Sequence, residues 1–338
     1  MSDVNEKDAD SHTSRQPYAQ LSPDLILDAI ESVGFHCTGS LFALNSYENR
    51  VYQVGIEDSA PLIAKFYRPY RWSDAAILEE HQFSAELFAQ EIPVVAPLTL
   101  ITHTTLHHYR DFRFALFPRQ GGRTLELDNI EHLEWMGRFI GRLHAVGACN
   151  PFQHRLRLDT QSYGYQPYQF LIEHDFIPDE LKHNFCYVIE AILQKIENCF
   201  QQVGPLEYIR LHGDCHPGNI LWNPAGPQIV DLDDCLMGPA IQDLWMLVTG
   251  DSRQERLAQL DHILRGYLEF YDFNFRERYL IEALRTLRMI HYAAWLAKRW
   301  EDPAFPLNFP WFNTPRYWQN QLEHFNEQLI LLEEAQDQ

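Results

Sequence analysis

The sequence predicts an α+β protein with two lobes, a small one built on a β-sheet and a larger one that is mostly helical. Two observations lead to this prediction. Short runs rich in β-branched and aromatic residues fill much of the chain up to residue 118. After Gly121 and Gly122, apolar residues recur at helical spacing in several segments. We therefore expect a sheet-based lobe over residues 21–118 and a helical lobe over residues 119–338, after a disordered polar tail over residues 1–20.

The first lobe is expected to begin with a short helix, because Ser22 can cap it and Pro23 suits its first position. A loop from residue 45 and two strands follow, the second of which contains Lys65. Ser73 caps a second helix that we expect to extend to about residue 90. Two further strands are predicted around residues 99–103 and 112–117, with residues 107–111 near the turn between them.

The second lobe contains four segments with helical periodicity, at residues 131–146, 185–200, 257–271 and 279–300. The segment between the second and third of these helices has short apolar runs and a turn at residues 223–226. This interruption of the helical pattern contains the residues that bear most directly on function.

Composition excludes several classes of protein. The formal net charge of −20 opposes binding to a phosphate backbone, so we expect no nucleic-acid partner. Six cysteines without a C-x-x-C pair argue against a zinc site or a disulfide framework and favour the cytoplasm. No apolar run reaches the about 18 residues of a membrane-spanning helix, and the polar first residues lack a signal-peptide core. We therefore expect no membrane partner either.

The most informative segment is residues 212–219, which read HGDCHPGN and are followed after a short apolar run by Asp231. Asp214 and Asn219 have the spacing of a kinase catalytic loop, D-x-x-x-x-N. Phosphoryl transfer needs a carboxylate at the acceptor hydroxyl, and oxygen ligands that hold Mg²⁺ on the phosphates. Taken alone, the loop has an ordinary alternative, because Asp, Asn, Gly and Pro are common turn residues. The apolar run, the acidic cluster after it and a lysine upstream favour the kinase interpretation.

That lysine is Lys65, which lies in the second predicted strand. A lysine in a buried strand needs partners, because an unpaired ammonium group is costly to remove from water. Phosphate oxygens and a helix carboxylate would suit it. Glu80, in the next predicted helix, is the preferred carboxylate, and Glu79 is the alternative. Either glutamate alone is more often part of a solvated helix face.

These residues together resemble the aminoglycoside phosphotransferase and choline kinase superfamily, whose typical pattern is H-G-D-x-H-x-x-N. More narrowly, the chain resembles the bacterial stress response kinase A family of serine/threonine protein kinases. The matching phrases read LNSYENRVY at residues 44–52, AKFYRP at 64–69, LEEHQF at 78–83, VDLDD at 230–234 and GPAIQDLW at 238–245. The resemblance covers about residues 21–330 and implies a bilobal protein-kinase-like fold.

The resemblance also implies roles for individual residues. Asp214 and Asp231 would be the catalytic pair, with Asp214 accepting the hydroxyl proton. Asp231 and Asn219 would hold Mg²⁺, the expected metal cofactor of the ATP co-substrate. Lys65 would hold the phosphates of ATP, and Glu80 would orient Lys65.

The same resemblance also bears on four further residues near the site. Ser46 would lie at the tip of the loop over the phosphates, although this loop lacks the G-x-G-x-x-G of many kinases. Asp243 would brace the catalytic loop through backbone hydrogen bonds, and His212 would pack beneath it. His216 is open between a role in the site and a cap on the loop.

Two pairs of residues near the predicted site stay open. Asp233 and Asp234 either contact a second Mg²⁺ or form a solvated acidic turn. Cys215 and Cys235 flank the metal motifs, and we interpret them as buried, inert thiols rather than a redox site.

Sequence therefore predicts an ATP- and Mg²⁺-dependent serine/threonine protein kinase, a monomer with a protein substrate and a role in stress survival. The alternative is a small-molecule kinase that phosphorylates choline, homoserine, an amino alcohol or an aminoglycoside, because the catalytic residues would be the same. A third interpretation, a pseudokinase scaffold, conflicts with a chain in which every expected catalytic position is filled.

Overall fold

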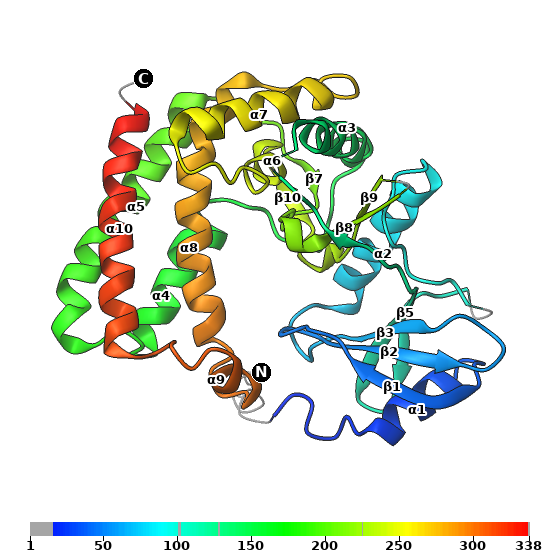
Figure 1. Cartoon of the computed structure of the whole chain (residues 1–338). Helices are drawn as coiled ribbons and strands as arrows, with labels where there is room; N and C mark the ends of the chain where they lie inside the picture. Colours follow the sequence, from blue (N-terminus) through cyan, green and yellow to red (C-terminus); the bar gives the residue numbers. More distant parts are fainter. Residues whose placement is uncertain (1–15, 101–102, 128, 225, 337–338) are drawn as a thin grey trace, which may run out of the picture.

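The computed structural model describes residues 16–100, 103–127, 129–224 and 226–336. It has an N-terminal lobe built on an antiparallel sheet, at the lower right of Figure 1, and a larger, mostly helical C-terminal lobe, which fills the left and the top of the view. This arrangement confirms the predicted α+β, bilobal fold class. The residue limits of the two lobes stay a prediction.

The N-terminal sheet has five strands in the order β1-β2-β3-β5-β4, each antiparallel to its neighbour. The strands are β1 (Cys37–Ala43), β2 (Arg50–Ile56), β3 (Leu62–Phe66), β4 (His107–Tyr109) and β5 (Phe112–Pro118). Helix α1 (Pro23–Glu31) begins at Ser22, whose side chain accepts a hydrogen bond from the backbone N–H of Leu25. The buried stripe of α1 packs on the sheet around Phe66 and Phe114.

One predicted strand was wrong. We expect a strand over residues 99–103 and residues 107–111 near the next turn. The turn before β5 does lie at residues 110–111, but the strand that precedes it is β4 at His107–Tyr109, which pairs with β5. His103 has a left-handed backbone with φ 58°, and its N–H donates to the carbonyl of Leu100 at 2.9 Å. The backbone N–H of Leu98 donates to the carbonyl of Leu116 in β5 at 2.7 Å, but the strand that forms a ladder with β5 begins only at residue 107. Residues 101–102 lie outside the described residues.

The predicted tail falls mainly on residues 1–15, outside the described residues. Within residues 16–20, the hydroxyl of Tyr18 donates to the carbonyls of Glu48 at 3.1 Å and Phe66 at 3.3 Å. Tyr18 also packs against the core between α1 and the sheet. The part of the chain that contacts the first lobe therefore begins before residue 21.

The C-terminal lobe has eight α-helices and two small sheets among the described residues. The helices are α3 (Ile130–Gly147), α4 (Gln166–Glu173), α5 (Asp179–Val203), α6 (Ile241–Trp245), α7 (Arg253–Tyr267), α8 (Ile281–Ala297), α9 (Ala304–Asn308) and α10 (Pro315–Gln336). One sheet pairs β7 (Ile209–Leu211) with β10 (Leu236–Gly238), and the other has the order β6 (Arg123–Thr124), β8 (Ile220–Asn223), β9 (Gly226–Ile229). Four of the helices coincide with the four predicted segments.

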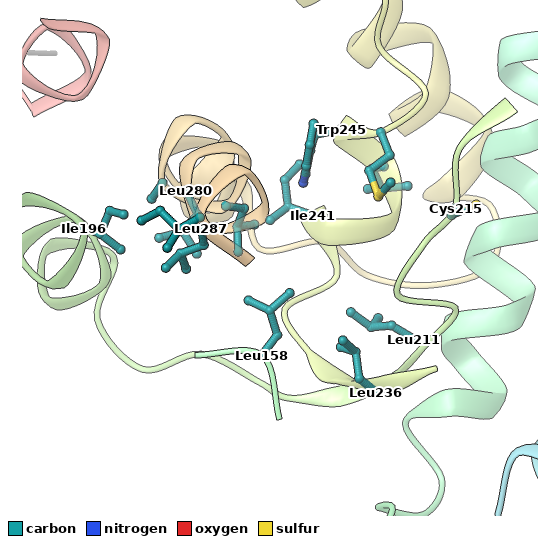
Figure 2. Packing of buried hydrophobic residues seen from close by; sticks show 14 of the residues in the cluster. Leu158, Ile196, Leu211, Cys215, Leu236, Ile241, Trp245, Leu280 and Leu287 are labelled. Carbon is teal, nitrogen blue, oxygen red and sulfur yellow. The ribbon is translucent and has the colours of Figure 1, made fainter. Parts of the chain in front are cut away.

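A single large apolar core holds this lobe together. Figure 2 shows residues from α5, α6, α8, β7 and β10 meeting in it, among them Ile196, Ile241, Leu287 and Leu211. Because β7 and β10 pack their side chains into this core, the loops that follow β7 and precede β10 start from fixed positions. Those two loops carry the predicted catalytic residues.

Helix α2 (Asp74–Ala89) connects the two lobes. Its residues Phe83 and Leu87 are fully buried against Ile229 of β9 and Leu232 of the C-terminal lobe. Ser73 caps this helix as predicted, because its side chain accepts from the backbone N–H of Ala76. The apolar contact fixes α2, and with it Glu79 and Glu80, against the loop that contains Asp231. None of the helices within the described residues is long and apolar enough to cross a membrane.

Helices α3 and α7 approach closely at glycines, which yields a test of the packing. A Cβ atom added at Gly137 would lie 1.9 Å from the carbonyl oxygen of Ile263, a backbone atom that cannot move alone. Alanine is the better helix former by about 1 kcal/mol, but overpacking commonly costs about 1–3 kcal/mol or more. We expect Gly137→Ala to lower the free energy of unfolding by about 2 kcal/mol, measured by urea denaturation.

Gly121→Ala is the matched control, because nothing lies within 4 Å of the Cβ position there. An unchanged or increased stability of Gly137→Ala would show that the two helices do not pack as closely as described.

Candidate active site

The segment of residues 212–219 runs between β7 and β8, and Asp231 follows β9. Strands β8 and β9 form a hairpin in which Asn223 pairs with Gly226, at the place of the predicted turn, while residue 225 lies outside the described residues. At the open end of this hairpin the backbone N–H of Val230 donates to the carbonyl of Asn219 at 2.9 Å. The hairpin therefore brings Asn219 next to the start of the segment that carries Asp231, although 11 residues separate them in the sequence.

Asp243 holds the beginning of the loop. Its two carboxylate oxygens accept hydrogen bonds from the backbone N–H groups of His212 and Gly213, both at 2.8 Å. The imidazole of His144, on α3, lies 3.1 Å from the same carboxylate. Gly213 has φ +84°, and a Cβ there would lie 2.3 Å from the carbonyl oxygen of Asp234. The tight approach explains why glycine precedes Asp214.

His212 and His216 both act on the loop through hydrogen bonds. In His212 the Nδ1 atom accepts from the backbone N–H of Asp214 at 3.3 Å, while Nε2 faces the carbonyl of Val230 at 3.0 Å. In His216 the Nδ1 atom accepts from the backbone N–H of Gly218 at 3.0 Å. This contact leaves Nε2 of His216 as the protonated nitrogen, 3.4 Å from a carboxylate oxygen of Asp214. His216 therefore caps the loop and also faces Asp214.

Asp214 lies mostly buried between these groups and helix α8. The guanidinium of Arg288, on α8, is 2.6 Å from one of its carboxylate oxygens. Burial alone would raise the pKa of Asp214, but the hydrogen bond from His216 and the charge of Arg288 hold this pKa well below its usual value. Asp214 is therefore a carboxylate throughout the neutral pH range. The side-chain amide of Asn219 donates to the backbone carbonyl of Asp214 at 3.0 Å.

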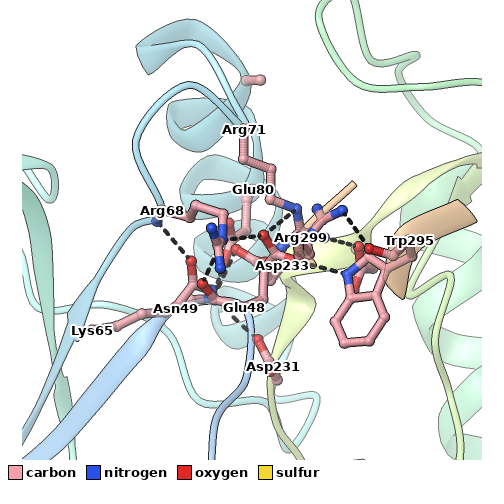
Figure 3. A network of polar contacts seen from close by, with 12 residues as sticks. Glu48, Asn49, Lys65, Arg68, Arg71, Glu80, Asp231, Asp233, Trp295 and Arg299 are labelled. Carbon is pink, nitrogen blue, oxygen red and sulfur yellow. Dashed lines mark hydrogen bonds and ion pairs between the residues drawn. The ribbon is translucent and has the colours of Figure 1, made fainter. Parts of the chain in front are cut away.

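Lys65 lies in the middle of a buried charge cluster, shown in Figure 3. Its ammonium group is 3.3 Å from Glu80 and 3.1 Å from each of Asp231 and Asp233. Burial by itself would lower the pKa of Lys65, but the charges of these three carboxylates raise it well above the usual value. The lysine thus stays charged although its side chain is only 7% exposed.

The contacts of Glu80 and Glu79 show which of the two carboxylates pairs with Lys65. Glu80 pairs with Lys65 and also with the guanidinium of Arg155, at 2.8 Å. The carboxylate of Glu79 instead accepts from the backbone N–H groups of residues 153–155, at 2.6–3.1 Å. One glutamate therefore faces the charge cluster, while its neighbour attaches α2 to the C-terminal lobe.

Glu48 attaches the loop between β1 and β2 to the C-terminal lobe (Figure 3). Its carboxylate lies 2.6 Å from the indole nitrogen of Trp295 and 2.5 Å from the guanidinium of Arg299, both from the α8 region. Arg68, which follows β3, contacts Glu48 at 3.0 Å and Asp302 at 2.5 Å. Ser46 lies in this loop, partly buried, two residues before Glu48. The loop without glycines is thus fixed by ionic contacts.

Asp233 and Asp234 are both paired with Arg71. Asp233 is 3% exposed, so the alternative of a solvated acidic turn does not describe it. Cys215 and Cys235 are buried, and burial raises the pKa of each thiol, which agrees with inert cysteines.

The donor set fits a magnesium ion. Asp231 has left-handed backbone, φ 58°, and its side chain is 53% exposed beside the hairpin end that carries Asn219. Because the amide nitrogen of Asn219 donates to Asp214, its amide oxygen is the atom left for a cation. No group of three or more His, Cys, Asp or Glu residues in the described part of the chain could hold a metal by itself. Mg²⁺ typically takes one or two protein oxygens and completes its shell with phosphate and water oxygens.

Sequence reasoning missed the arginines of this site. Arg71, Arg155, Arg288 and Arg299 each contact an acidic residue at least 74 positions away in the chain. The spacing of Arg288, His291, Trp295 and Lys298 is the one signal that was available. These residues recur every three or four positions and therefore lie on one face of α8. The sequence predicts a helix in this segment but assigns no role to that face.

Comparison with known proteins gives this site its context. Residues 41–281 match the group described as "Phosphotransferase enzyme family", and the chain belongs to this family. "Stress response kinase A" of Salmonella choleraesuis (strain SC-B67) is 45% identical over 317 residues, covering 94% of this chain and 95% of the relative. "Serine/threonine protein kinase RdoA" of Salmonella typhimurium shares the same identity and coverage. These matches confirm the resemblance to the stress response kinase A family, and the chain is an ATP-dependent kinase.

Solved structures with low sequence identity share the fold. An amicoumacin kinase in complex with AMP-PNP, Ca²⁺ and its ligand has a TM-score of 0.68 at 19% identity, with 95% of both chains covered. A microcompartment-associated aminopropanol kinase has a TM-score of 0.67 at 17% identity, covering 94% of this chain and 98% of that one. Both agree with a kinase-like, bilobal architecture.

The contacts of Glu48 give a test of how the lobes are held. Glu48→Gln keeps the shape of the side chain but removes the charge that faces Arg68 and Arg299. Removing one partner of a buried ion pair typically costs about 3–5 kcal/mol. We expect a loss of about 3 kcal/mol in the free energy of unfolding at pH 7, measured by urea denaturation.

The same variant has a predictable pH dependence. Burial alone would raise the pKa of Glu48, but the charges of Arg71 and Arg299 hold it below the usual value. A lowered folded-state pKa stabilises the protein above the unfolded-state pKa, about 4.3, and this contribution is lost as the pH falls further. The difference between wild type and variant should be full at pH 7 and shrink below about pH 4.

Glu126→Gln is the control, because the pair between Glu126 and Arg123 lies on the surface. Surface pairs contribute about 0–1 kcal/mol. The loss of stability in Glu48→Gln could be as small as that of the control, or could fail to change with pH. Either result would contradict the buried ion pairs of Glu48.

Proposed function

We propose that the chain is a serine/threonine protein kinase that transfers the γ-phosphate of Mg·ATP to a protein hydroxyl. The observation that supports this most strongly is the ordered set of Lys65, Glu80, Asp214 and Asp231 around one site, in a chain 45% identical to a protein named a serine/threonine protein kinase. Phosphoryl transfer depends mainly on positioning and electrostatic stabilisation, and these are the properties of the charge cluster.

Asp214 acts as the proton acceptor. Its lowered pKa makes it a weak base, but the transition state of phosphoryl transfer is loose, so the hydroxyl needs orientation before it needs full deprotonation. A carboxylate held by His216 and Arg288 supplies this orientation. The proton then moves to Asp214 as the new P–O bond to the acceptor oxygen forms and the bond from the γ-phosphorus to the bridging oxygen breaks, which releases ADP.

Lys65 and the loop at Ser46 hold the triphosphate. Lys65 is kept charged by its carboxylates, and Glu80 keeps it in position from the side of α2. Asn219 and Asp231 would hold Mg²⁺, which offsets the negative charge of the phosphates when it is bound. Ser46, with neighbouring backbone amides, is our candidate for the cover over the phosphates, because the loop has no glycine between Asn45 and Arg50.

A small-molecule kinase is the second candidate. It is supported by the solved structures with this fold, which include an amicoumacin kinase and an aminopropanol kinase. At 17–19% identity these solved structures are similar in fold alone. The relatives at 45% identity are named a stress response kinase and a serine/threonine protein kinase. We therefore prefer a protein acceptor, a cytoplasmic monomer and a role in stress survival.

Transfer of labelled γ-phosphate tests both the mechanism and the acceptor. Wild type and Asp214→Ala are incubated with Mg·ATP alone, with a basic protein, and with a panel of amino alcohols and aminoglycosides. We expect label on serine or threonine of protein with wild type, and a rate about 10²- to 10⁴-fold lower in the variant at unchanged nucleotide affinity.

Label found only on a small molecule would replace the protein acceptor by the second candidate. A variant that retains the wild-type rate would refute Asp214 as the proton acceptor.

Arg288 gives a pH test of the same assignment. The charge of Arg288 helps to keep the pKa of Asp214 low, so Arg288→Gln should raise this pKa towards the usual value. Activity needs the ionised carboxylate, and the acid limb of kcat/KM should therefore move to higher pH in the variant. Profiles measured between pH 4 and 8 check this, and Arg285→Gln is the control, since Arg285 pairs with Glu282 on the same helix. Identical acid limbs in wild type and Arg288→Gln would contradict the assignment.

A further inference from the structure

A cavity of about 250 Å³ lies beside the charge cluster, between the segment after β3, the loop of residues 234–236 and helix α8. Its lining includes three basic side chains, Arg71, Lys298 and Arg299, and one carboxylate, Asp234. Tyr163, His291 and Trp295 contribute aromatic surface, and the rings of Tyr163 and His291 stack with centroids 4.2 Å apart. In a chain with a net charge of −20, a cavity whose charged side chains are mostly basic is unusual.

The basic side chains of this cavity differ in how they are balanced. Arg71 is paired with Asp233 and Asp234, and Arg299 is paired with Glu48. Lys298 has no acidic partner among the described residues, and its ammonium group lies 5.2 Å from the centre of the Phe170 ring. Lys298 is exposed, at the rim of the cavity, and is therefore accessible to a ligand.

The electrostatic field in the cavity is positive. Burial lowers the pKa of His291 to about 3, and the charges of Lys298, Arg299, Arg288 and Arg71 all act in the same direction. Burial and the charge of Arg299 also lower the pKa of Lys298. Like charges that disfavour one another in this way would be stabilised by an anion.

The cavity is next to the proposed proton acceptor. Asp234, which lines the cavity, lies against the residue before Asp214, since a Cβ added at Gly213 would be 2.3 Å from the carbonyl oxygen of Asp234. Arg288, which contacts Asp214, lies on α8 one turn before His291 and on the same face as Trp295 and Lys298. A group bound in the cavity would therefore lie close to a hydroxyl held at Asp214.

We propose that this cavity binds an acidic side chain of the acceptor protein, a carboxylate or phosphate close in sequence to the serine or threonine that is phosphorylated. The inference rests on the proposed protein kinase activity and specifies its substrate class. Lys298 supplies the unpaired charge, with the guanidinium of Arg299 beside it, and the aromatic wall covers the stem of the side chain. The hydroxyl of the same segment reaches Asp214.

The overall charge makes this inference easy to distinguish from a general electrostatic effect. A protein of net charge −20 repels acidic peptides and attracts basic ones. A preference for acidic peptides can therefore come only from local cationic groups. The cavity is the place next to Asp214 where such groups line an opening.

The test uses the full-length protein and three serine peptides that differ only in the residues beside the serine. The first peptide has acidic flanking residues and is made in two forms, one with aspartate and one with phosphoserine. The flanking residues are glutamine in the second peptide and lysine in the third. We expect kcat/KM for the acidic peptide to exceed that for the glutamine peptide about tenfold, mainly through KM. An equal or lower value for the acidic peptide would overturn the inference.

Lys298→Glu tests the site itself. This variant should lose the preference for the acidic peptide and favour the lysine peptide, whereas Lys298→Arg should keep the wild-type order. Lys182→Glu is the matched control, since Lys182 is a lysine on α5 that pairs with Asp175 and lies outside the cavity. Retention of the acidic preference by Lys298→Glu would show that another surface selects the peptide.

The glutamine peptide distinguishes a failure of the acidic site from a failure of the protein kinase activity. If it is phosphorylated without any preference for acidic neighbours, the protein kinase activity stands and the acidic site is wrong. If none of the peptides is labelled although an ATP analogue binds, the protein kinase activity is wrong, and the peptide site falls with it.

Discussion

The ammonium group of Lys65 lies between the two lobes within 3.3 Å of three carboxylates, from α2 and from the segment after β9. The cost of burying so many charges is offset only while all of them keep their partners, because a buried ion without a partner is strongly destabilising. Strand β3, helix α2 and the β8–β9 hairpin are therefore fixed relative to one another. The position of Asp231, beside the end of the β8–β9 hairpin that carries Asn219, follows from this constraint.

Arginines join the charge cluster around Lys65 to other segments of the two lobes. Arg155 attaches Glu80 to the C-terminal lobe, and Arg71 joins the segment after β3 to Asp233 and Asp234. Glu48 then connects the loop between β1 and β2 to Trp295 and Arg299. Many kinases use glycines in this loop so that the backbone can approach phosphate. Here the loop is positioned from the side of α8 by a buried carboxylate.

Local patterns predicted much of the fold and part of the site. The caps at Ser22 and Ser73, the helical periodicity and the spacing of Asp214 and Asn219 depend on neighbouring residues, so they can be found in a single sequence. The pairing of Lys65 with Glu80 was predictable because a buried lysine requires a carboxylate. The sequence indicates only a preference for Glu80 over Glu79, since both lie on one helix and their distant partners decide the outcome.

Contacts between distant segments could not be predicted in this way. Arg71, Arg288 and Arg299 have ordinary surroundings in the sequence, and their carboxylate partners become neighbours only when the lobes meet. The same holds for the cavity beside α8, because its basic walls come from segments more than 200 residues apart. The missed strand β4 had a different cause, a left-handed residue at His103 that nothing in the local pattern required.

The central proposal is that Asp231, together with Asn219, would hold the divalent cation that accompanies the nucleotide. Calorimetric titration with the ATP analogue AMP-PNP, with and without Mg²⁺, tests this most directly for wild type and Asp231→Asn. The account predicts that Mg²⁺ strengthens binding to wild type at least about tenfold and has little effect on the variant, which still binds the free nucleotide. A variant whose affinity responds to Mg²⁺ as the wild type does would show that the metal is held elsewhere.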